Sequence, residues 1–88
     1  MAWTIEYSET ALKQLRKLDR SISHKIVDYL ANRIALLEDP RSEGHALTGG
    51  LKGHWRYRVG DYRIVCEVKD QVLLVFVLKI GHRREVYR

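Results

Sequence analysis

Cysteine is almost absent from this sequence of 88 residues, in which Cys66 is the single example. One cysteine can neither close an internal disulfide nor complete a cysteine-based zinc site, which fits a protein that works in a reducing compartment. Long apolar runs are also missing, since the longest, residues 72–78, is far too short to cross a membrane. Because the first residues lack the basic and then apolar layout of a signal peptide, we expect a soluble, cytoplasmic protein.

The chain is too short for a second domain, and we predict one globular domain over residues 1–88. Its composition, 45% hydrophobic and 31% charged, is ordinary for a folded protein. A domain of this size buries a limited share of its surface, so we expect an active site in a surface groove and no large cofactor.

Positive charge is concentrated in the second half of the sequence. Residues 1–50 contain 7 basic and 7 acidic residues, whereas residues 51–88 contain 9 and 4, so the net charge of +5 lies entirely in the second half. Such an asymmetry favours a polyanionic partner, with nucleic acid as the first candidate and an acidic protein as the second. A merely solubilising surface would also account for it.

The first half predicts a strand followed by two helices. Residues 3–7 alternate apolar and polar side chains, as a half-buried strand does. Ser8 is then a predicted N-cap of a short helix with three leucines between residues 12 and 18. We expect a second helix that begins at Ser21 or Ser23 and ends at Pro40. The apolar face of the second helix is Ile22, Ile26, Leu30, Ile34 and Leu37.

The second half predicts a sheet. Residues 41–53 are polar and glycine-rich, and indicate an ordered loop held to the core by Leu47 and Leu51. Gly60-Asp61 has the composition of a two-residue hairpin turn of type II′. The predicted strands are residues 54–59, 62–69 and 72–80. The element order β-α-α-β-β-β predicts an α+β fold, in which a helical hairpin packs on a largely antiparallel sheet.

The Gly60-Asp61 turn also predicts the register of its hairpin, with Arg58 directly opposite Arg63. Neighbours across a ladder share a face, so Arg56, Arg58 and Arg63 point away from the apolar face. Like charges placed opposite each other are destabilising, and an anion between them would relieve the repulsion. Guanidinium groups bind phosphate bidentately, so we predict a phosphodiester site here. The predicted apolar face is Trp55, Tyr57, Val59, Tyr62, Ile64 and Cys66.

The end of the chain supplies further groups for RNA. His82, Arg83, Arg84 and Tyr87 combine an imidazole, two cations and an aromatic ring, and single-stranded RNA is bound by such rings and cations together. RNA cleavage needs no metal in principle, because the ribose 2′-hydroxyl can attack its own phosphate. Simpler interpretations stay open: solvated arginines, a turn histidine at 82 and a core tyrosine at 87. The remaining histidines lack metal-ligand spacing, so we predict no metal site.

The sequence resembles the RelE-type toxins of bacterial type II toxin–antitoxin systems, within the RelE/ParE superfamily. The resemblance extends over essentially the whole chain. Its carriers are residues 3–13, 39–41, 47–49, 55–65 and 80–87, of which the last, Ile-Gly-His-Arg-Arg-Glu-Val-Tyr, is the most specific. It implies the fold predicted above and a ribosome-dependent endoribonuclease that cuts mRNA in the A site without a metal. It also implies the partners: a RelB-like antitoxin that wraps around the toxin, the 70S ribosome with its mRNA, and operator DNA reached only through the antitoxin.

The resemblance also implies roles for individual residues. Arg58 and Arg63 would stabilise charge, Arg83 would act on the leaving-group side, Tyr87 would stack or transfer a proton, and His82 is a further candidate acid. The RNA-binding set is Lys52, Arg56, Arg58, Arg63 and Arg84. One departure affects the mechanism. The two hairpin positions, Arg56 and Arg58, are lysines in the best-known members, and an arginine is a poor general base at neutral pH. Proton abstraction then falls to Tyr87, His82, Glu85 or a group on the ribosome.

Two other functions fit the same fold. One is a relative of ParE that poisons DNA gyrase by protein contact and cuts no RNA. The other is a binding module whose toxicity has decayed.

Overall fold

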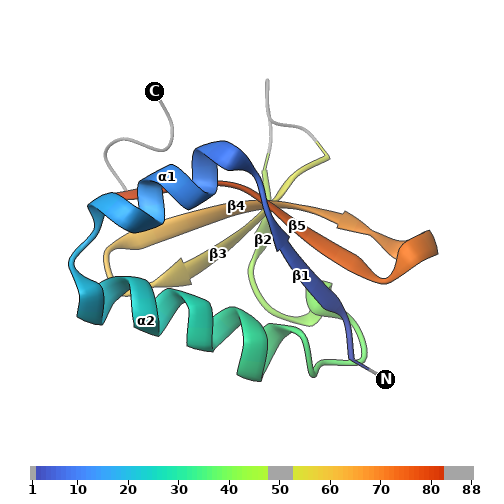
Figure 1. Cartoon of the computed structure of the whole chain (residues 1–88). Coiled ribbons are helices and arrows are strands. Elements are labelled where there is room, and N and C mark those ends of the chain that lie inside the picture. Colours follow the sequence, from blue (N-terminus) through green and yellow to red (C-terminus); the bar gives the residue numbers. More distant parts are fainter. Residues whose placement is uncertain (1, 48–52, 83–88) are drawn as a thin grey trace.

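The computed structural model describes residues 2–47 and 53–82, and within them a five-stranded sheet has the order β1-β5-β4-β3-β2. β1 pairs with β5 in parallel, and the other neighbours are antiparallel. The helices and strands are β1 (Thr4–Tyr7), α1 (Glu9–Lys17), α2 (Arg20–Tyr29), β2 (His45–Ala46), β3 (Trp55–Val59), β4 (Tyr62–Lys69) and β5 (Leu74–His82). This confirms the predicted α+β fold, to which the structure adds the short strand β2. Figure 1 shows α1 beside the C-terminal end of β5, and α2 below the sheet beneath β3.

The start of α1 is as predicted, but the start of α2 is not. Ser8 Oγ accepts a hydrogen bond from the N–H of Ala11 at 3.0 Å, which satisfies a donor of the first turn. α2 begins after Asp19, ahead of the predicted caps. The carbonyl of Asp19 already accepts from the N–H groups of Ile22 and Ser23, which places both predicted serine caps inside or at the edge of the first turn.

The second helix also ends earlier than predicted. After α2 the chain makes a π-helical turn, Leu30–Ile34, and leaves the helical path well before Pro40. The carbonyl groups that follow are taken by the N-terminal segment: Trp3 donates its backbone N–H to Ala35 at 2.7 Å and its indole N–H to Glu38 at 3.2 Å. These long-range hydrogen bonds to Trp3, the residue just before β1, replace the last turn of the helix.

The start of β5 is a further correction. Val72 was predicted to open the strand, but it belongs to a 3-10 turn, Asp70–Val72, and is 64% exposed. Leu73 then has a φ of 51°, which no strand residue adopts, so the strand begins at Leu74. The predicted register of the hairpin is confirmed, since Val59 pairs with Tyr62 and Gly60 has a φ of 58°, although its first strand begins at Trp55 rather than at residue 54.

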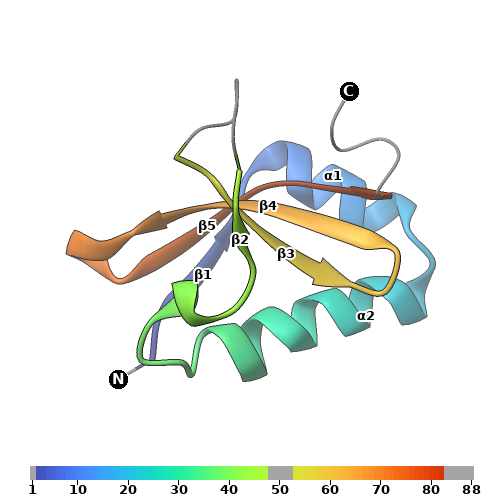
Figure 2. The same ribbon diagram turned by 180° about the vertical axis from the view of Figure 1, so that it is seen from behind.

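The core lies between α2 and the sheet, and Figure 2 shows the β3–β4 hairpin above α2. Tyr57 is its largest fully buried side chain, and Cys66 is buried with it as predicted. Burial raises the pKa of the Cys66 thiol, which is therefore no reactive thiolate. The other fully buried apolar residues of this cluster include Ala11, Ile26, Leu30, Ile34, Ile64, Val75 and Val77. No helix of the described residues is long and apolar enough to cross a membrane.

α1 covers the edge of β5 beyond the point where β1 ends. Ser8 donates its backbone N–H to Val77 at 2.9 Å and its hydroxyl to the carbonyl of Leu78 at 2.7 Å. Farther along the helix, the side-chain oxygen of Gln14 accepts the N–H of Ile80. An open strand edge is a site of unwanted pairing, and α1 occupies this one. The helix is thereby fixed alongside residues 78–80.

Candidate functional site

The candidate site is the sheet face opposite the buried core. On β3 and β4, Tyr57 and Ile64 are fully buried against the helices, so Arg58 and Arg63 on either side point the other way. The register pairs Arg58 with Arg63 directly, as the sequence predicted. Arg56 lies on the same face and pairs with Val65. We call this surface the arginine face.

Arg63 is the most unusual residue of the arginine face, because it is a cation with only 9% of its surface exposed. Its guanidinium contacts two carbonyl oxygens, those of Gly60 and Tyr62, both at 3.4 Å. Carbonyl contacts of this length do not neutralise a charge, and a buried cation is costly unless an anion accompanies it. The position is therefore suited to a negatively charged ligand.

The second arginine approaches the same turn. Arg58 is exposed, and its Nε donates to the carbonyl of Gly60 at 3.3 Å, so both guanidinium groups meet at one oxygen atom. Arg58 and Arg63 lie opposite each other in register and donate to the same carbonyl of the turn. Positive charge is therefore concentrated at the closed end of the hairpin. Such a pair can hold a phosphate group through several N–H donors.

Lys79 joins the arginine face, and sequence reasoning missed it. In register, Val65 lies between Arg56 on β3 and Lys79 on β5. Val65 is 1% exposed although it lies on the face opposite the helices. The β4–β5 register has a bulge after Val65, which shifts the alternation of β5. Because the sequence does not reveal this bulge, it does not predict which face of the sheet Lys79 occupies.

His82 is placed apart from the arginines. It pairs with Tyr62, and the two rings make an edge-to-face contact with centroids 5.8 Å apart. Tyr62 and its hairpin partner Val59 share the face of the buried core, whereas Arg63 shares the other. The structure thus brings Arg56, Arg58 and Arg63 together and leaves His82 on the opposite side. Lys52, Arg83, Arg84, Glu85 and Tyr87 lie outside the described residues.

Strand β3 is braced from the loop that precedes it. Tyr57 donates its hydroxyl to the carbonyl of Pro40 at 2.7 Å, and the indole N–H of Trp55 donates to the carbonyl of Glu43 at 2.6 Å. Burial raises the pKa of Tyr57, which therefore stays a neutral hydrogen-bond donor. Arg33 holds the Glu43 carboxylate in an ion pair. These contacts fix the strand from which Arg56 and Arg58 project.

The arginine face is suited to bind anions and to stabilise negative charge. The described residues contain no group of three or more His, Cys, Asp or Glu side chains that could hold a metal ion. What the arginine face offers is a set of permanent cations on a rigid hairpin, suited to bind a phosphodiester and to stabilise additional negative charge on it.

Comparison with known proteins gives a consistent result. Residues 5–87 match the family described as the ParE toxin of type II toxin–antitoxin systems, parDE. The mRNA interferase toxin RelE of Escherichia coli K12 is 34% identical over 90 residues, covering 99% of this chain and 92% of its own.

Solved structures agree with the sequence match. The toxin–antitoxin complex RelBE2 of Mycobacterium tuberculosis contains a chain with a TM-score of 0.85 and 26% identity, covering 97% of this chain and 95% of that one. The isolated E. coli RelE toxin has a TM-score of 0.73 and 31% identity, covering 98% and 92%. The chain therefore belongs to the ParE toxin family of type II toxin–antitoxin systems, as a RelE-type toxin.

Proposed function

We propose that this toxin is a metal-independent endoribonuclease that cuts mRNA in the ribosomal A site and so inhibits translation. The observation that carries the proposal is the buried Arg63 opposite Arg58, an arrangement suited to bind a phosphodiester. The relative of 34% identity that is named an mRNA interferase supports the choice of RNA as substrate. Because ribosomes are in the cytoplasm, the toxin would act there.

In this proposal the ribose 2′-hydroxyl attacks the adjacent phosphorus, and the bond to the 5′-oxygen breaks. Arg58 and Arg63 stabilise the charge that develops on the pentacovalent phosphate, and such electrostatic stabilisation is usually the largest single contribution to catalysis. Arg83 acts on the leaving-group side, and Arg56, Lys52 and Arg84 bind the RNA backbone. No step of this chemistry requires a metal ion.

The proton transfers are assigned to Tyr87 or to a group on the ribosome. Arginine does not fit this role, because its guanidinium stays protonated at neutral pH and cannot accept a proton. To reach a phosphate on the arginine face, His82 would have to leave its contact with Tyr62, so Tyr87 is the better candidate. Glu85 is the other acid of the same segment.

The decisive experiment is toeprinting on ribosomes stalled with a defined codon in the A site. We expect cleavage at that codon by the wild type, also with a trace of EDTA that binds transition metals while excess Mg²⁺ keeps the ribosome intact, and none on free mRNA. Arg83→Ala should lower the rate by about 100-fold, the usual loss when a group that stabilises transition-state charge is removed. Tyr87→Phe should lower it too. If the wild-type toxin leaves the mRNA intact and instead arrests DNA gyrase in a supercoiling assay, the protein is a gyrase poison.

We also propose that a cognate RelB-like antitoxin neutralises this toxin and carries the complex to its operator. The structure of an E. coli RelE mutant with an antitoxin peptide, at 30% identity and a TM-score of 0.74, supports a partner that binds as a linear segment. A groove between α1 and α2 fits such a segment. Leu12 and Val27 stand in it 39% and 40% exposed, and Arg16 and Lys25 line its sides. An amphipathic segment with acidic flanks would bury the apolar residues and pair with the cations.

Placing a charge in this groove tests the assignment. We expect Leu12→Glu to weaken antitoxin binding by about 10- to 100-fold, because it replaces an apolar contact with a carboxylate that must be desolvated and that repels the acidic flanks of the segment. Leu36→Glu is the matched control, since Leu36 is 64% exposed and is not among the residues that line the groove. Calorimetric titration of toxin with antitoxin measures both. Equal affinities for the two variants would place the antitoxin elsewhere.

A further inference from the structure

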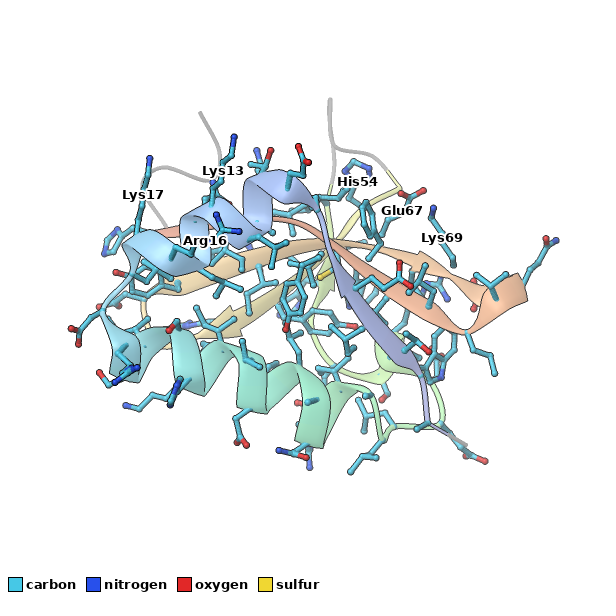
Figure 3. The ribbon with its side chains drawn as sticks, in the orientation of Figure 1. Lys13, Arg16, Lys17, His54, Glu67 and Lys69 are labelled. Carbon is cyan, nitrogen blue, oxygen red and sulfur yellow. The ribbon has the colours of Figure 1, made fainter. Side chains whose placement is uncertain are left out.

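The open face of the sheet continues past the arginines to an end with different chemistry. Along β4, Cys66 is fully buried and Val68 packs against the core, so Glu67 and Lys69 point to the same side as Arg63. Figure 3 shows Glu67 and Lys69 on the side of the sheet away from α2. This end of the face therefore carries a carboxylate, whereas the end at the hairpin turn carries arginines.

An aromatic ring lies between two carboxylates at this end. In register, Phe76 of β5 has Glu67 of β4 on one side and Glu6 of β1 on the other. Its neighbours along the strand, Val75 and Val77, are fully buried in the core, so Phe76 and both glutamates face outward. We define the platform as Phe76, Glu6, Glu67 and Lys69.

The ring of Phe76 can be reached from solvent. The ammonium group of Lys69, an exposed residue, lies 5.4 Å from the centroid of the ring. The contact of an exposed cation with a ring is weaker than the stacking of a base on it, so a base can take the place of the ammonium group. Lys69 would then be close enough to pair with a phosphate of the bound strand.

The carboxylates determine which part of a nucleotide fits. Glu67 takes part in neither ion pair of the described residues, which are Arg33 with Glu43 and Arg41 with Asp70. A carboxylate only accepts hydrogen bonds, and it repels phosphate. Guanine has two adjacent N–H donors on its Watson–Crick edge, whereas the single N–H of uracil lies between two carbonyl oxygens. The platform therefore favours a base with donors, guanine above all, over uracil.

The platform is continuous with the phosphodiester site. Arg63 and Glu67 are four residues apart on β4, which is about 13 Å along a strand. Between them, Val65 and Lys79 pair across the same face. A strand with its scissile phosphate at Arg63 would therefore place a neighbouring base on Phe76.

We propose that the platform is a base-recognition subsite for the mRNA. Phe76 stacks on a base that flanks the cut, and Glu67 accepts hydrogen bonds from the Watson–Crick edge of that base, so guanine is preferred to uracil. The inference rests on the proposed cleavage of RNA and adds to it the residues that select the sequence. Arg58 and Arg63 bind a phosphate, which every nucleotide has, so they contribute affinity without selecting a base.

Glu67→Gln tests the choice of base. Guanine and uracil are exchanged at each position that flanks the cut on stalled ribosomes, and kcat/KM is measured. We expect the wild type to prefer guanine at one position by about 10-fold, within the usual discrimination of a bidentate contact. Glu67→Gln should cut both substrates equally within twofold, because its amide no longer offers two acceptors. Glu38→Gln removes an exposed carboxylate outside the platform and should keep the wild-type preference.

Phe76→Leu tests the stacking. Leucine keeps an apolar side chain on β5 but has no ring, and urea unfolding checks that the fold is retained. We expect KM for the guanine substrate to rise about 10-fold, as loss of a base–ring contact does, with kcat within twofold. Phe76→Tyr keeps the ring and should keep the wild-type KM. An unchanged KM for Phe76→Leu overturns the proposal, as does a preference for guanine that survives in Glu67→Gln.

A binding measurement without cleavage separates failure of this inference from failure of the proposed function. Isotope-labelled toxin is titrated by NMR with short single-stranded RNA whose riboses are all 2′-O-methylated, so that no strand can be cut. We expect amide shifts at Glu67 and Phe76, and about 10-fold tighter binding of a guanine-containing oligonucleotide than of its uracil counterpart, even if ribosomal cleavage is absent. Shifts confined to Arg58 and Arg63, with equal affinities, overturn the platform and leave the phosphate site in place.

Discussion

Replacing Arg63 with methionine should lower mRNA cleavage by about 100- to 1000-fold and leave the protein as stable as the wild type, or more stable. The two effects have one cause. Arg63 is 9% exposed and its contacts are carbonyl oxygens, so the free protein bears the cost of a desolvated cation that bound phosphate would compensate. A methionine has a similar length and no charge, and replacing buried ionic groups by apolar ones is often neutral or stabilising.

The same substitution elsewhere provides the control. Arg33 forms an ion pair with Glu43 and 62% of its side chain is exposed. Arg33→Met should leave cleavage within twofold and lower the free energy of unfolding by at most about 1 kcal/mol, as is usual for surface pairs. Urea unfolding and cleavage of stalled ribosomal complexes measure both variants. If Arg63→Met unfolds more easily and still cuts at the wild-type rate, Arg63 is a structural residue.

The features that were predicted correctly from the sequence depend on neighbours in the chain. The register of β3 and β4 follows from the two-residue turn at Gly60-Asp61, because a turn of that length allows one pairing. That pairing was enough to place Arg58 opposite Arg63. The cap at Ser8 is equally local, since its partner is three residues away.

The features that were missed depend on distant contacts. α2 gives up its last turn to bonds with Trp3, which is more than thirty residues away in sequence. The side of the sheet that His82 occupies depends on a bulge in β5, and periodicity alone does not reveal a bulge. The burial of Arg63 is likewise a property of the assembled sheet, and an exposed strand arginine has the same sequence pattern.

A single methyl group added at Gly44 should destabilise the fold strongly. It has a φ of 82° and precedes β2, next to the loop that braces β3. A Cβ at this position would lie under 3.0 Å from the carbonyl oxygen of Arg56, the indole nitrogen of Trp55 and a ring carbon of Tyr57. None of these is the free end of a flexible chain, because Trp55 and Tyr57 are both held by hydrogen bonds to the same loop.

We therefore expect Gly44→Ala to lower the free energy of unfolding by about 2–5 kcal/mol, from left-handed backbone strain together with the steric clash. Gly53→Ala isolates the strain, because Gly53 has a φ of 92° and nothing within 4 Å of the added Cβ, and it should cost about 1–2 kcal/mol. Urea unfolding of both variants separates the two contributions. The difference between them is the energetic cost of displacing Trp55 and Tyr57, so equal losses would mean that β3 yields easily. In that case the rigidity on which Arg56 and Arg58 depend would have to come from β4 alone.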